Sequence, residues 1–273
     1  MTPTSYLQRD QPEGVPPLAL TGERTLPDVP EENYWFRRHL VVYEWIAAQT
    51  GGLRVIDMAC GEGYGSDVLA RDAASVVGVD ANPEAHEHAR LRYRRANVRF
   101  ARELIETFAE PADAVVFLQT IEHLSDPGAA LDHFGGLVAA SAAEAASADA
   151  ASGPAGRGTV FVSTPNVLTL APKGAERSGN PWHVHEYRFE EFDRLCREHF
   201  RDVRMFGLFY ARKLRAHELA LRLGWDSLHA RLGVTKRFYD WFTPAIAVSD
   251  FALRPVGQAR IERALDFIAV CRV

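Results

Sequence analysis

The sequence has few cysteines and no apolar run long enough to cross a membrane. Its three cysteines, Cys60, Cys196 and Cys271, are scattered among 273 residues. An odd, scattered set excludes a disulfide framework and favours reduced thiols. A membrane-spanning helix needs about 20 consecutive apolar residues, and the N-terminal residues also lack the apolar core of a signal peptide. We therefore expect a protein without a membrane span that stays in the cytoplasm.

The sequence also lacks an excess of positive charge. It contains 31 lysines and arginines against 36 aspartates and glutamates, a formal net charge of −5. This balance argues against a nucleic-acid partner, which would require clustered positive charge. A basic cluster at Arg90, Arg92, Arg94 and Arg95 has the spacing of a solvated helix face. With 47% hydrophobic and 25% charged residues, the composition is that of a globular protein with a large core.

Apolar runs that alternate with helical patterns predict the fold. Because each run is followed by a helical segment, the pattern predicts a doubly wound α/β sheet. Two later runs, separated by an insertion, complete a mostly parallel sheet of seven strands. The first five runs cover residues 53–59, 75–80, 97–101, 113–119 and 159–164, and the later two cover 202–210 and 264–273.

Four segments depart from this alternation. Residues 1–19 are rich in proline and polar residues, which predicts a disordered leader before a single domain over 20–273. A helical block precedes the first strand. Residues 139–158 are alanine-rich and of low complexity, and we expect a flexible surface insertion there. Residues 211–258 are mostly helical and are predicted to form a lid over the crevice at the strand ends.

A glycine-rich turn is the strongest functional signal. Residues 55–65 read V-I-D-M-A-C-G-E-G-Y-G, an apolar strand that runs into the turn, and Asp80 ends the next strand. Glycines let the backbone approach a ligand closely. A carboxylate at the next strand end accepts hydrogen bonds from ribose hydroxyls. The pair predicts a nucleoside-binding crevice.

The spacing of the glycines narrows the choice of nucleoside. A dinucleotide fingerprint needs G-x-G-x-x-G, whereas Ser66 and Asp67 follow the glycines at 61, 63 and 65. The segment from Asp57 to Gly63 instead resembles motif I of the class I S-adenosylmethionine (SAM) methyltransferases. Ala59 stands where that family often has its first glycine. The resemblance implies SAM as cofactor and S-adenosylhomocysteine as product.

Methyl transfer to a hydroxyl requires alignment and a base. Transfer from a sulfonium is an in-line displacement, so positioning supplies much of the catalysis. A sugar hydroxyl also needs a general base, and His123, just beyond the fourth strand, titrates near neutral pH. His123 alternatively caps the following helix or orients the loop. Glu122 beside it either joins the catalysis or bonds local backbone.

A second cluster, N-P-W-H-V-H-E-Y at residues 180–187, follows the fifth strand. On an extended segment, His183 and His185 share one face. Together with the nearby Glu186 they have the residue types of a metal site. Two histidines and a carboxylate in a loop more often serve as hydrogen-bonding groups. We therefore predict a contact with a hydroxyl-rich acceptor and no bound metal.

Five motifs together resemble one particular family, the actinobacterial mycofactocin oligosaccharide methyltransferases. The likeness runs from about residue 20 to residue 273. It implies SAM-dependent O-methylation of a glucose in the short glucan attached to mycofactocin, a peptide-derived redox cofactor. The acceptor would then be a glycosylated small molecule. The motifs are L-T-G-E-R-T-x-P (20–27), E-N-Y-W-F-R-R-H (32–39), G-E-G-Y-G (61–65), I-E-H-L (121–124) and S-T-P-N (163–166).

The resemblance and the motifs together give a set of expected site residues. On the cofactor side, the resemblance implies that Asp57, Gly61 and Gly63 lie at the methionine end of SAM, Asp80 at the ribose and Gln119 at the reactive side. Glu103 is expected near the adenine, and Ala81 is a further expected cofactor residue. Aromatics before the first strand either close over the cofactor or dock the N-terminal helix on the sheet. The other expected cofactor residues are Ala59 and Tyr34, and the expected acceptor residues are Asn166, His183, His185 and Tyr187.

Two alternatives stay open at this point. In the first alternative the protein is still a methyltransferase, but its acceptor is another glycoside, such as a lipid-linked or polysaccharide sugar, or a secondary metabolite. In the second alternative the protein binds SAM without turnover, as a sensor or a scaffold. The intact turn around Gly61 and the presence of His123 favour an enzyme.

Overall fold

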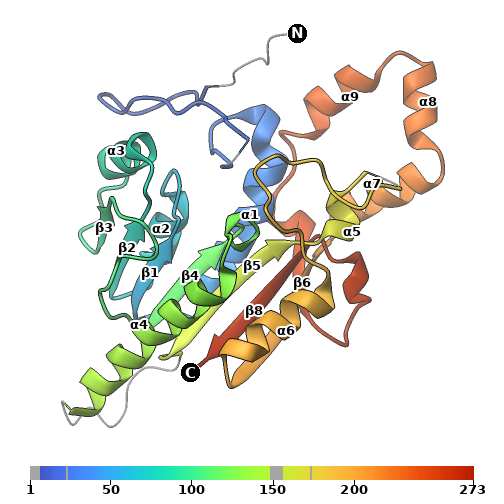
Figure 1. Ribbon diagram of the computed structural model, residues 1–273. Helices are drawn as coiled ribbons and strands as arrows, with labels where there is room; N and C mark the ends of the chain where they lie inside the picture. Colours follow the sequence, from blue (N-terminus) through green and yellow to red (C-terminus); the bar gives the residue numbers. More distant parts are fainter. Residues whose placement is uncertain (1–6, 23, 148–155, 173) are drawn as a thin grey trace.

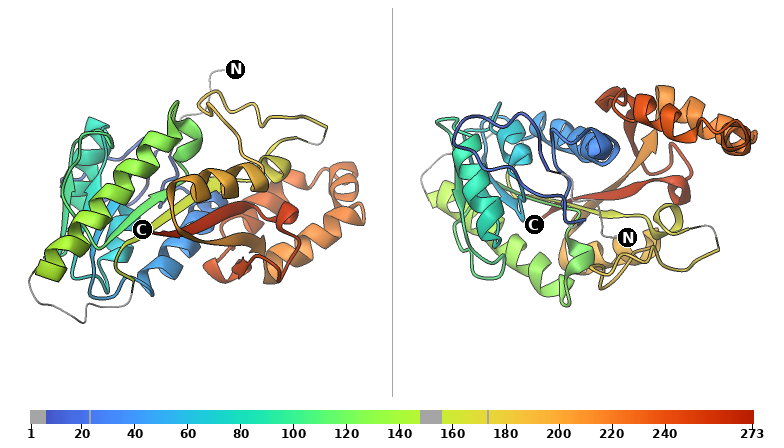
Figure 2. Two further views of the ribbon diagram at one scale, coloured as in Figure 1. Left: turned by 60° about the horizontal axis from the view of Figure 1, so that its bottom comes forward. Right: turned by 90° about the horizontal axis from the view of Figure 1, so that it is seen from above.

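The computed structural model describes residues 7–22, 24–147, 156–172 and 174–273. One eight-stranded sheet runs through the molecule, with helices on both faces (Figures 1 and 2). The strand order is β3-β2-β1-β4-β5-β8-β6-β7. Its strands are β1 (Arg54–Met58), β2 (Ser75–Val79), β3 (Val98–Ala101), β4 (Ala114–Leu118), β5 (Thr159–Pro165), β6 (Asp202–Tyr210), β7 (Phe251–Pro255) and β8 (Asp266–Arg272).

The pairing confirms the predicted doubly wound α/β sheet. Strands β1 to β5 are parallel to one another, and β8 is antiparallel to both β5 and β6. The sheet has eight strands rather than the predicted seven. The additional strand, β7, pairs with β6 at the sheet edge. It was missed because it is short and ends at Pro255, a residue confined to such edges in sheets.

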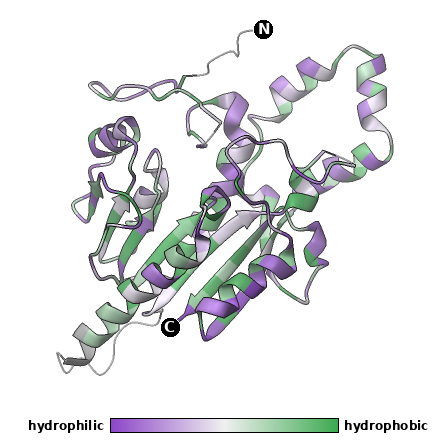
Figure 3. Ribbon diagram, in the orientation of Figure 1, coloured by the Kyte–Doolittle hydropathy of each residue, from purple (hydrophilic) through white to green (hydrophobic). Residues whose placement is uncertain are grey.

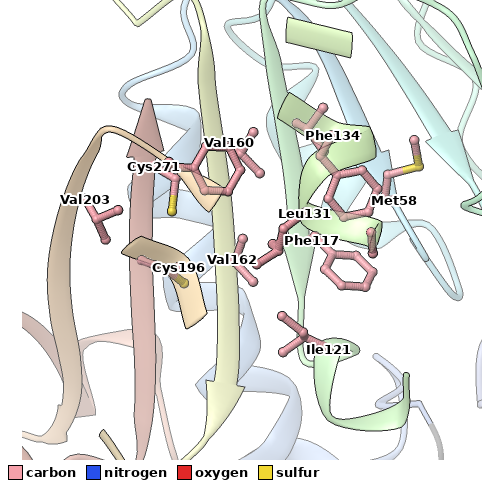
Figure 4. Packing of buried hydrophobic residues seen from close by; sticks show 14 of the residues in the cluster. Met58, Phe117, Ile121, Leu131, Phe134, Val160, Val162, Cys196, Val203 and Cys271 are labelled. Carbon is pink, nitrogen blue, oxygen red and sulfur yellow. The ribbon is translucent and has the colours of Figure 1, made fainter. Parts of the chain in front are cut away.

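Helices cover the two faces of the sheet. The central strands are largely hydrophobic (Figure 3). Buried side chains of the helices pack on them. On one face, α4 and α6 pack on β4, β5 and β8, where Phe134 lies 4.9 Å from Phe117 between ring centroids (Figure 4). The other face carries α1 and α2. The helices are α1 (Asn33–Ala47), α2 (Tyr64–Leu69), α3 (Pro83–Arg92), α4 (Pro127–Ser147), α5 (Val167–Leu170), α6 (Phe189–His199), α7 (Arg212–Arg222), α8 (Trp225–Arg231) and α9 (Thr235–Phe242).

None of the helices within the described ranges has both the length and the apolar character needed to cross a membrane. Short 3-10 turns connect several elements. They are η1 (Pro30–Glu32), η2 (Ile121–His123), η3 (Val248–Asp250) and η4 (Ile261–Arg263).

A buried ion pair fixes α1 to the sheet. Arg38 donates to both carboxylate oxygens of Asp266, at 2.8 and 2.5 Å, and to the carbonyl of Leu265 at 2.7 Å. The two charged side chains are 4% and 1% exposed. Because a buried charge is costly unless it is paired and hydrogen-bonded, this pair sets where α1 lies against the start of β8.

The described part of the expected leader has fixed contacts. Leu7 pairs with Ala19 in an isolated bridge, and Leu18 is buried in a small cluster. Gln8 donates to Glu62 at 3.0 Å. The structure therefore gives residues 7–19 an ordered place that their composition did not predict, whereas residues 1–6 lie outside the described residues.

The alanine-rich segment is helical as far as it is described. Residues 139–147 form the last turns of α4 rather than a flexible insertion, because alanine has the highest helix propensity. Ser141 in this part donates to Asp113 at 2.6 Å. Residues 148–155, the rest of the expected insertion, lie outside the described residues.

The expected lid contains α7, α8 and α9 and ends in β7. It lies beside α1, whose first residue, Asn33, donates to the carbonyls of Thr243 and Ile246 at 2.9 Å each. Residues of α7, including Arg215 and Arg222, line a cavity of about 470 Å³ with the end of β6 and with Leu265, just before β8. The segment therefore borders the carboxyl edge of the sheet.

Candidate active site

Two strained residues mark the point where the strand order reverses. Ala59 and Gln119 follow the adjacent parallel strands β1 and β4, with φ of 56° and 52°. A left-handed conformation costs a residue other than glycine about 1–3 kcal/mol, and such residues cluster at functional sites. Open α/β sheets bind their ligands at this switch point.

The glycine turn, residues 59–65, is open at Gly61 and closely packed at Gly63, where an added Cβ would lie 2.8 Å from the Ala89 Cβ. Gly61 and Gly63 have φ of 55° and 97°. A Cβ added at Gly61 would meet open space, so a ligand has access to the backbone there. The Gly61 amide donates to Asp80 at 2.8 Å, and the Asn82 amide donates to the other oxygen at 2.8 Å. This half-buried carboxylate is thus held at the end of β2, and the open turn and fixed acid fit a nucleoside cofactor.

Asp57 supports the turn from behind. Its side chain is fully buried and accepts hydrogen bonds from Tyr43 at 3.1 Å and Ser66 at 2.7 Å. Burial raises the pKa of Asp57 to about 7, and the two hydroxyl donors oppose that rise. In the structure Asp57 therefore supports the turn through Tyr43 and Ser66.

Glu62 is a central residue of the turn that the sequence analysis missed. Its buried carboxylate accepts from Gln8 at 3.0 Å, His88 at 2.9 Å and Tyr93 at 2.7 Å, and it lies 3.1 Å from Arg92. These contacts join the N-terminal segment and α3 to the turn. No local pattern marked Glu62, because Gln8, His88 and Tyr93 lie 26 or more residues from it in the chain.

The remaining expected cofactor residues lie in different surroundings. Ala81 and Glu103 are exposed on the loops after β2 and β3. Tyr34 shares a hydrogen bond of 2.9 Å with Tyr210 and packs near Phe251. The structure therefore supports the docking alternative for Tyr34, on strands β6 and β7.

A cleft of about 440 Å³ lies beside Gln119. Its walls come from three segments: the N-terminal block, the ends of β4 and β5, and the loop before α6. The cleft combines several titratable side chains with a tryptophan. The lining residues are Leu20, Gly22, Arg24, Thr25, Glu32, Trp35, His39, Gln119, Glu122, His123, Pro165, Leu170, Ser178, Gly179, Asn180 and His183.

His123 and Glu122 occupy η2, directly after β4. The Nδ1 atom of His123 lies 2.9 Å from the carbonyl of Trp182, which places a proton on Nδ1 and makes Nε2 the basic nitrogen. Glu122 is 2% exposed and accepts from the Thr164 hydroxyl at 3.1 Å. Burial raises the pKa of Glu122 to about 8. Both residues line the cleft, as the sequence analysis expected.

The loop before α6 separates its two histidines. His183 lines the cleft, where its Nδ1 lies 2.8 Å from Glu186 and its Nε2 lies 3.0 Å from the Asn180 amide. His185 lies in a different cavity together with Tyr187, whose side chain is buried. A shared face requires an extended segment, whereas the amides of residues 184 and 185 both donate to the Glu122 carbonyl. The structure thus places His185 and Tyr187 away from the cleft.

Asn166 also has a structural place. Its side chain caps α5 by accepting from the Leu168 amide at 3.0 Å, and it donates to the Ala264 carbonyl at 2.7 Å. An asparagine at a helix N-cap satisfies an otherwise unpaired amide. Asn166 is fully buried, so the structure assigns it to holding α5 rather than to binding an acceptor.

Three cleft residues that were not among the expected site residues come from η1 and α1. Glu32, Trp35 and His39 follow one another at spacings of three and four, which places them on one helix face. Burial raises the pKa of Glu32 to about 7 and lowers that of His39 to about 4. The helical spacing was the signal for this wall of the cleft.

Three cleft donors lie close enough together to hold a metal ion. One ligand atom each from Glu122, His123 and His183 lies within 4.8 Å of the others. The His123 and His183 rings meet edge to face, with centroids 5.1 Å apart.

A family model described as a methyltransferase domain matches residues 35–201, more than half of the chain. The chain belongs to this methyltransferase family. A probable SAM-dependent methyltransferase of Mycobacterium tuberculosis is 36% identical over 263 residues, which cover 93% of this chain and 89% of that protein. One of Mycolicibacterium smegmatis is 33% identical, with 93% and 94% covered. The protein is therefore a methyltransferase that uses SAM as its methyl donor.

Solved structures agree with the fold. A SAM-dependent methyltransferase of Thermotoga maritima, described as a possible histamine N-methyltransferase, matches with a TM-score of 0.53. The match covers 89% of this methyltransferase and 94% of that chain at 14% sequence identity. At this identity the likeness concerns the fold alone, a class I methyltransferase sheet.

Proposed function

We propose that this methyltransferase methylates a sugar hydroxyl, namely one on a glucose of the mycofactocin oligosaccharide. The observation that carries the proposal is the cleft, whose polar walls and aromatic rings suit a hydroxyl-rich ligand. Trp35 in the cleft wall is 38% exposed, and an amphipathic ring of this kind offers a flat surface with a polar edge. The motif resemblance supports the particular acceptor.

Gly61, Gly63, Asp80 and Gln119 are the residues that would hold SAM. The open glycine backbone suits its methionine end, and the fixed Asp80 carboxylate suits the ribose. Bound SAM supplies an electrophilic methyl group on a sulfonium. The protein's task is then to align a hydroxyl with that methyl and to exclude other nucleophiles.

His123 is the residue proposed to activate the hydroxyl. Its bond to the Trp182 carbonyl fixes the ring, so that Nε2 is the nitrogen able to accept a proton. General-base catalysis of this kind contributes about 10²–10⁴-fold. Asn180 and His183 on one wall and Glu32 on the other offer hydrogen-bond partners for the remaining hydroxyls of a sugar.

Transfer of a labelled methyl group tests the proposal. The protein is incubated with methyl-labelled SAM and with purified glycosylated mycofactocin, and then with actinobacterial extracts, and label is traced by mass spectrometry. Label on a glucose of the mycofactocin glycan is the expected result. Label confined to another glycoside or a lipid would show that the proposed acceptor is wrong. SAM binding without transfer to any acceptor would show that the protein does not catalyse methyl transfer.

A further inference from the structure

We propose that Glu122, His123 and His183 form a binding site for a divalent transition-metal cation that activates the acceptor hydroxyl. The inference rests on the proposed function and deepens it, because it concerns the same cleft. It also replaces the prediction, made from the loop sequence alone, that the site holds no metal. Three independent features of the structure carry it: the spacing of the donors, the orientation of the imidazoles, and the place of the cluster.

The donor set and its spacing suit such an ion. Two imidazoles and a carboxylate lie with their ligand atoms within 4.8 Å of one another. Bonds of about 2.1 Å to one ion bring neighbouring donors to about 3–3.5 Å, which modest side-chain rotations achieve here. Mixed nitrogen and oxygen donors favour first-row transition cations over Mg²⁺ or Ca²⁺, which prefer oxygen alone.

The partners of both imidazoles are those found behind metal ligands. A ligating histidine usually donates its other ring nitrogen to a carboxylate or a backbone carbonyl, which fixes its tautomer. Here His183 Nδ1 lies 2.8 Å from Glu186, and His123 Nδ1 lies 2.9 Å from the Trp182 carbonyl. Nε2 is therefore the basic nitrogen of each imidazole. That of His183 accepts from the Asn180 amide at 3.0 Å, a hydrogen bond that a bound ion would replace. The Glu122 carboxylate is oriented in turn by the Thr164 hydroxyl at 3.1 Å.

The cluster lies in the wall of the cleft, beside Gln119. An ion held by three protein donors keeps open positions, and a sugar with neighbouring hydroxyls is a bidentate ligand for two of them. Coordination lowers the pKa of a bound hydroxyl, as it does for water. The O–H bond then breaks and its proton passes to water. The oxygen forms a bond to the methyl carbon as the carbon–sulfur bond breaks, and neutral S-adenosylhomocysteine leaves. In this scheme His123 acts as a ligand and no longer as the base.

Metal binding without any acceptor provides the decisive test. The full-length protein is stripped with a chelator, and Mn²⁺ and Zn²⁺ binding are measured by titration calorimetry, with Mn²⁺ also followed by electron paramagnetic resonance. We expect one ion per chain. His183→Ala should weaken binding at least tenfold, and Glu186→Gln, which keeps all three ligands, should weaken it about 10–100-fold.

His185→Ala is the matched control, because this histidine lies in the same loop but outside the cleft. It should bind the ion as the unaltered protein does. SAM affinity, measured on each variant, checks that the fold is intact. Absence of a bound ion in the unaltered protein, or equal losses in His183→Ala and His185→Ala, would overturn the site.

The methylation assay separates this inference from the proposed function. Transfer that stops in the stripped protein and returns with Mn²⁺ or Zn²⁺ supports the activating role of the ion. Undiminished transfer by stripped protein would overturn that role while leaving the transferase activity intact. Ion binding that responds to His183→Ala, together with transfer to an acceptor other than mycofactocin, would support the site and overturn only the acceptor.

Discussion

The glycine turn and the cleft share one edge of the sheet but are built differently. The turn depends on backbone conformation, with two glycines and the strained Ala59 setting its path. Around it, Asp57, Glu62 and Asp80 use their carboxylates to hold backbone and neighbouring side chains. The cleft depends on side chains that converge from three distant segments of the chain.

This difference separates the expected effects of mutation. A change in the turn alters the backbone itself, so donor affinity and stability should change together. A change in a cleft side chain removes one functional group from an exposed wall, so turnover should change while SAM affinity does not.

His123→Ala should lower turnover about 10²–10⁴-fold, because it removes the group that activates the hydroxyl either as a base or as a metal ligand. SAM affinity should stay within about twofold of that of the unaltered protein. Steady-state kinetics and SAM titration measure the two quantities. His185→Ala serves as the control and should leave both nearly unchanged. A parallel loss of SAM affinity in His123→Ala would break the separation.

Arg38→Met should lower the free energy of unfolding by about 3–5 kcal/mol, because it leaves the buried Asp266 carboxylate without its partner. Denaturant unfolding measures this effect. The double variant Arg38→Met with Asp266→Leu removes both charges and should regain most of the loss. If the double variant is no more stable than Arg38→Met, the unpaired carboxylate of Asp266 is not the cause of the loss.

Asp57 should make the stability of the protein depend on pH. Its pKa of about 7 in the folded protein exceeds the unfolded value of about 3.9. The folded state therefore binds more protons between these values, and this contribution to stability is lost as pH rises from about 4 through about 7. Asp57→Asn cannot titrate, so its free energy of unfolding should fall less over that range. Equal slopes in the two proteins would contradict the prediction.

Gly61→Ala should weaken SAM binding about tenfold and cost about 1 kcal/mol of stability, since it places a Cβ in the open cradle at positive φ. Gly52→Ala is the matched control, with φ of 73° and open space around it at the other end of β1. It should lose similar stability without a loss of SAM affinity. Isothermal titration and thermal unfolding distinguish the two variants.

Ala59→Gly should raise the free energy of unfolding by about 1 kcal/mol, because glycine adopts the observed φ of 56° without strain. SAM affinity should change by less than a factor of about three. Thermal unfolding measures the gain. A loss of stability would show that packing of the Ala59 methyl group stabilises the fold by more than the left-handed conformation of Ala59 destabilises it.

The sequence predicted the turn better than the cleft for a physical reason. Gly61, Gly63 and Asp80 are close in the chain, and backbone requirements at such positions leave a local signal. The spacing of His183 and His185 predicted that they share one face. Instead, the amides of residues 184 and 185 both donate to the Glu122 carbonyl, and the two histidines lie in different cavities. That hydrogen-bonding arrangement is a long-range contact, which no local pattern encodes.

Composition was also a poor guide where packing decided the outcome. Residues 7–19 are polar and proline-rich, but Gln8 and the Pro16 carbonyl reach the buried Glu62–His88 pair. The alanine-rich segment continues α4 to Ser147 because its helix propensity matters more than its low complexity. The central parallel strands β1, β4 and β5 were predictable because their residues are almost all buried, as in strands covered on both faces.

The Arg38–Asp266 pair has a consequence for biosynthesis. It joins α1, which contributes Trp35 and His39 to the cleft, to a strand that contains residues 266–272. During translation the glycine turn is complete long before the counterion of Arg38 leaves the ribosome. The nascent chain therefore carries an arginine without its carboxylate partner until β8 has been synthesised, and α1 gains this anchor on the sheet only then. A chain truncated before residue 266 lacks the carboxylate partner of Arg38, even when its glycine turn has already formed.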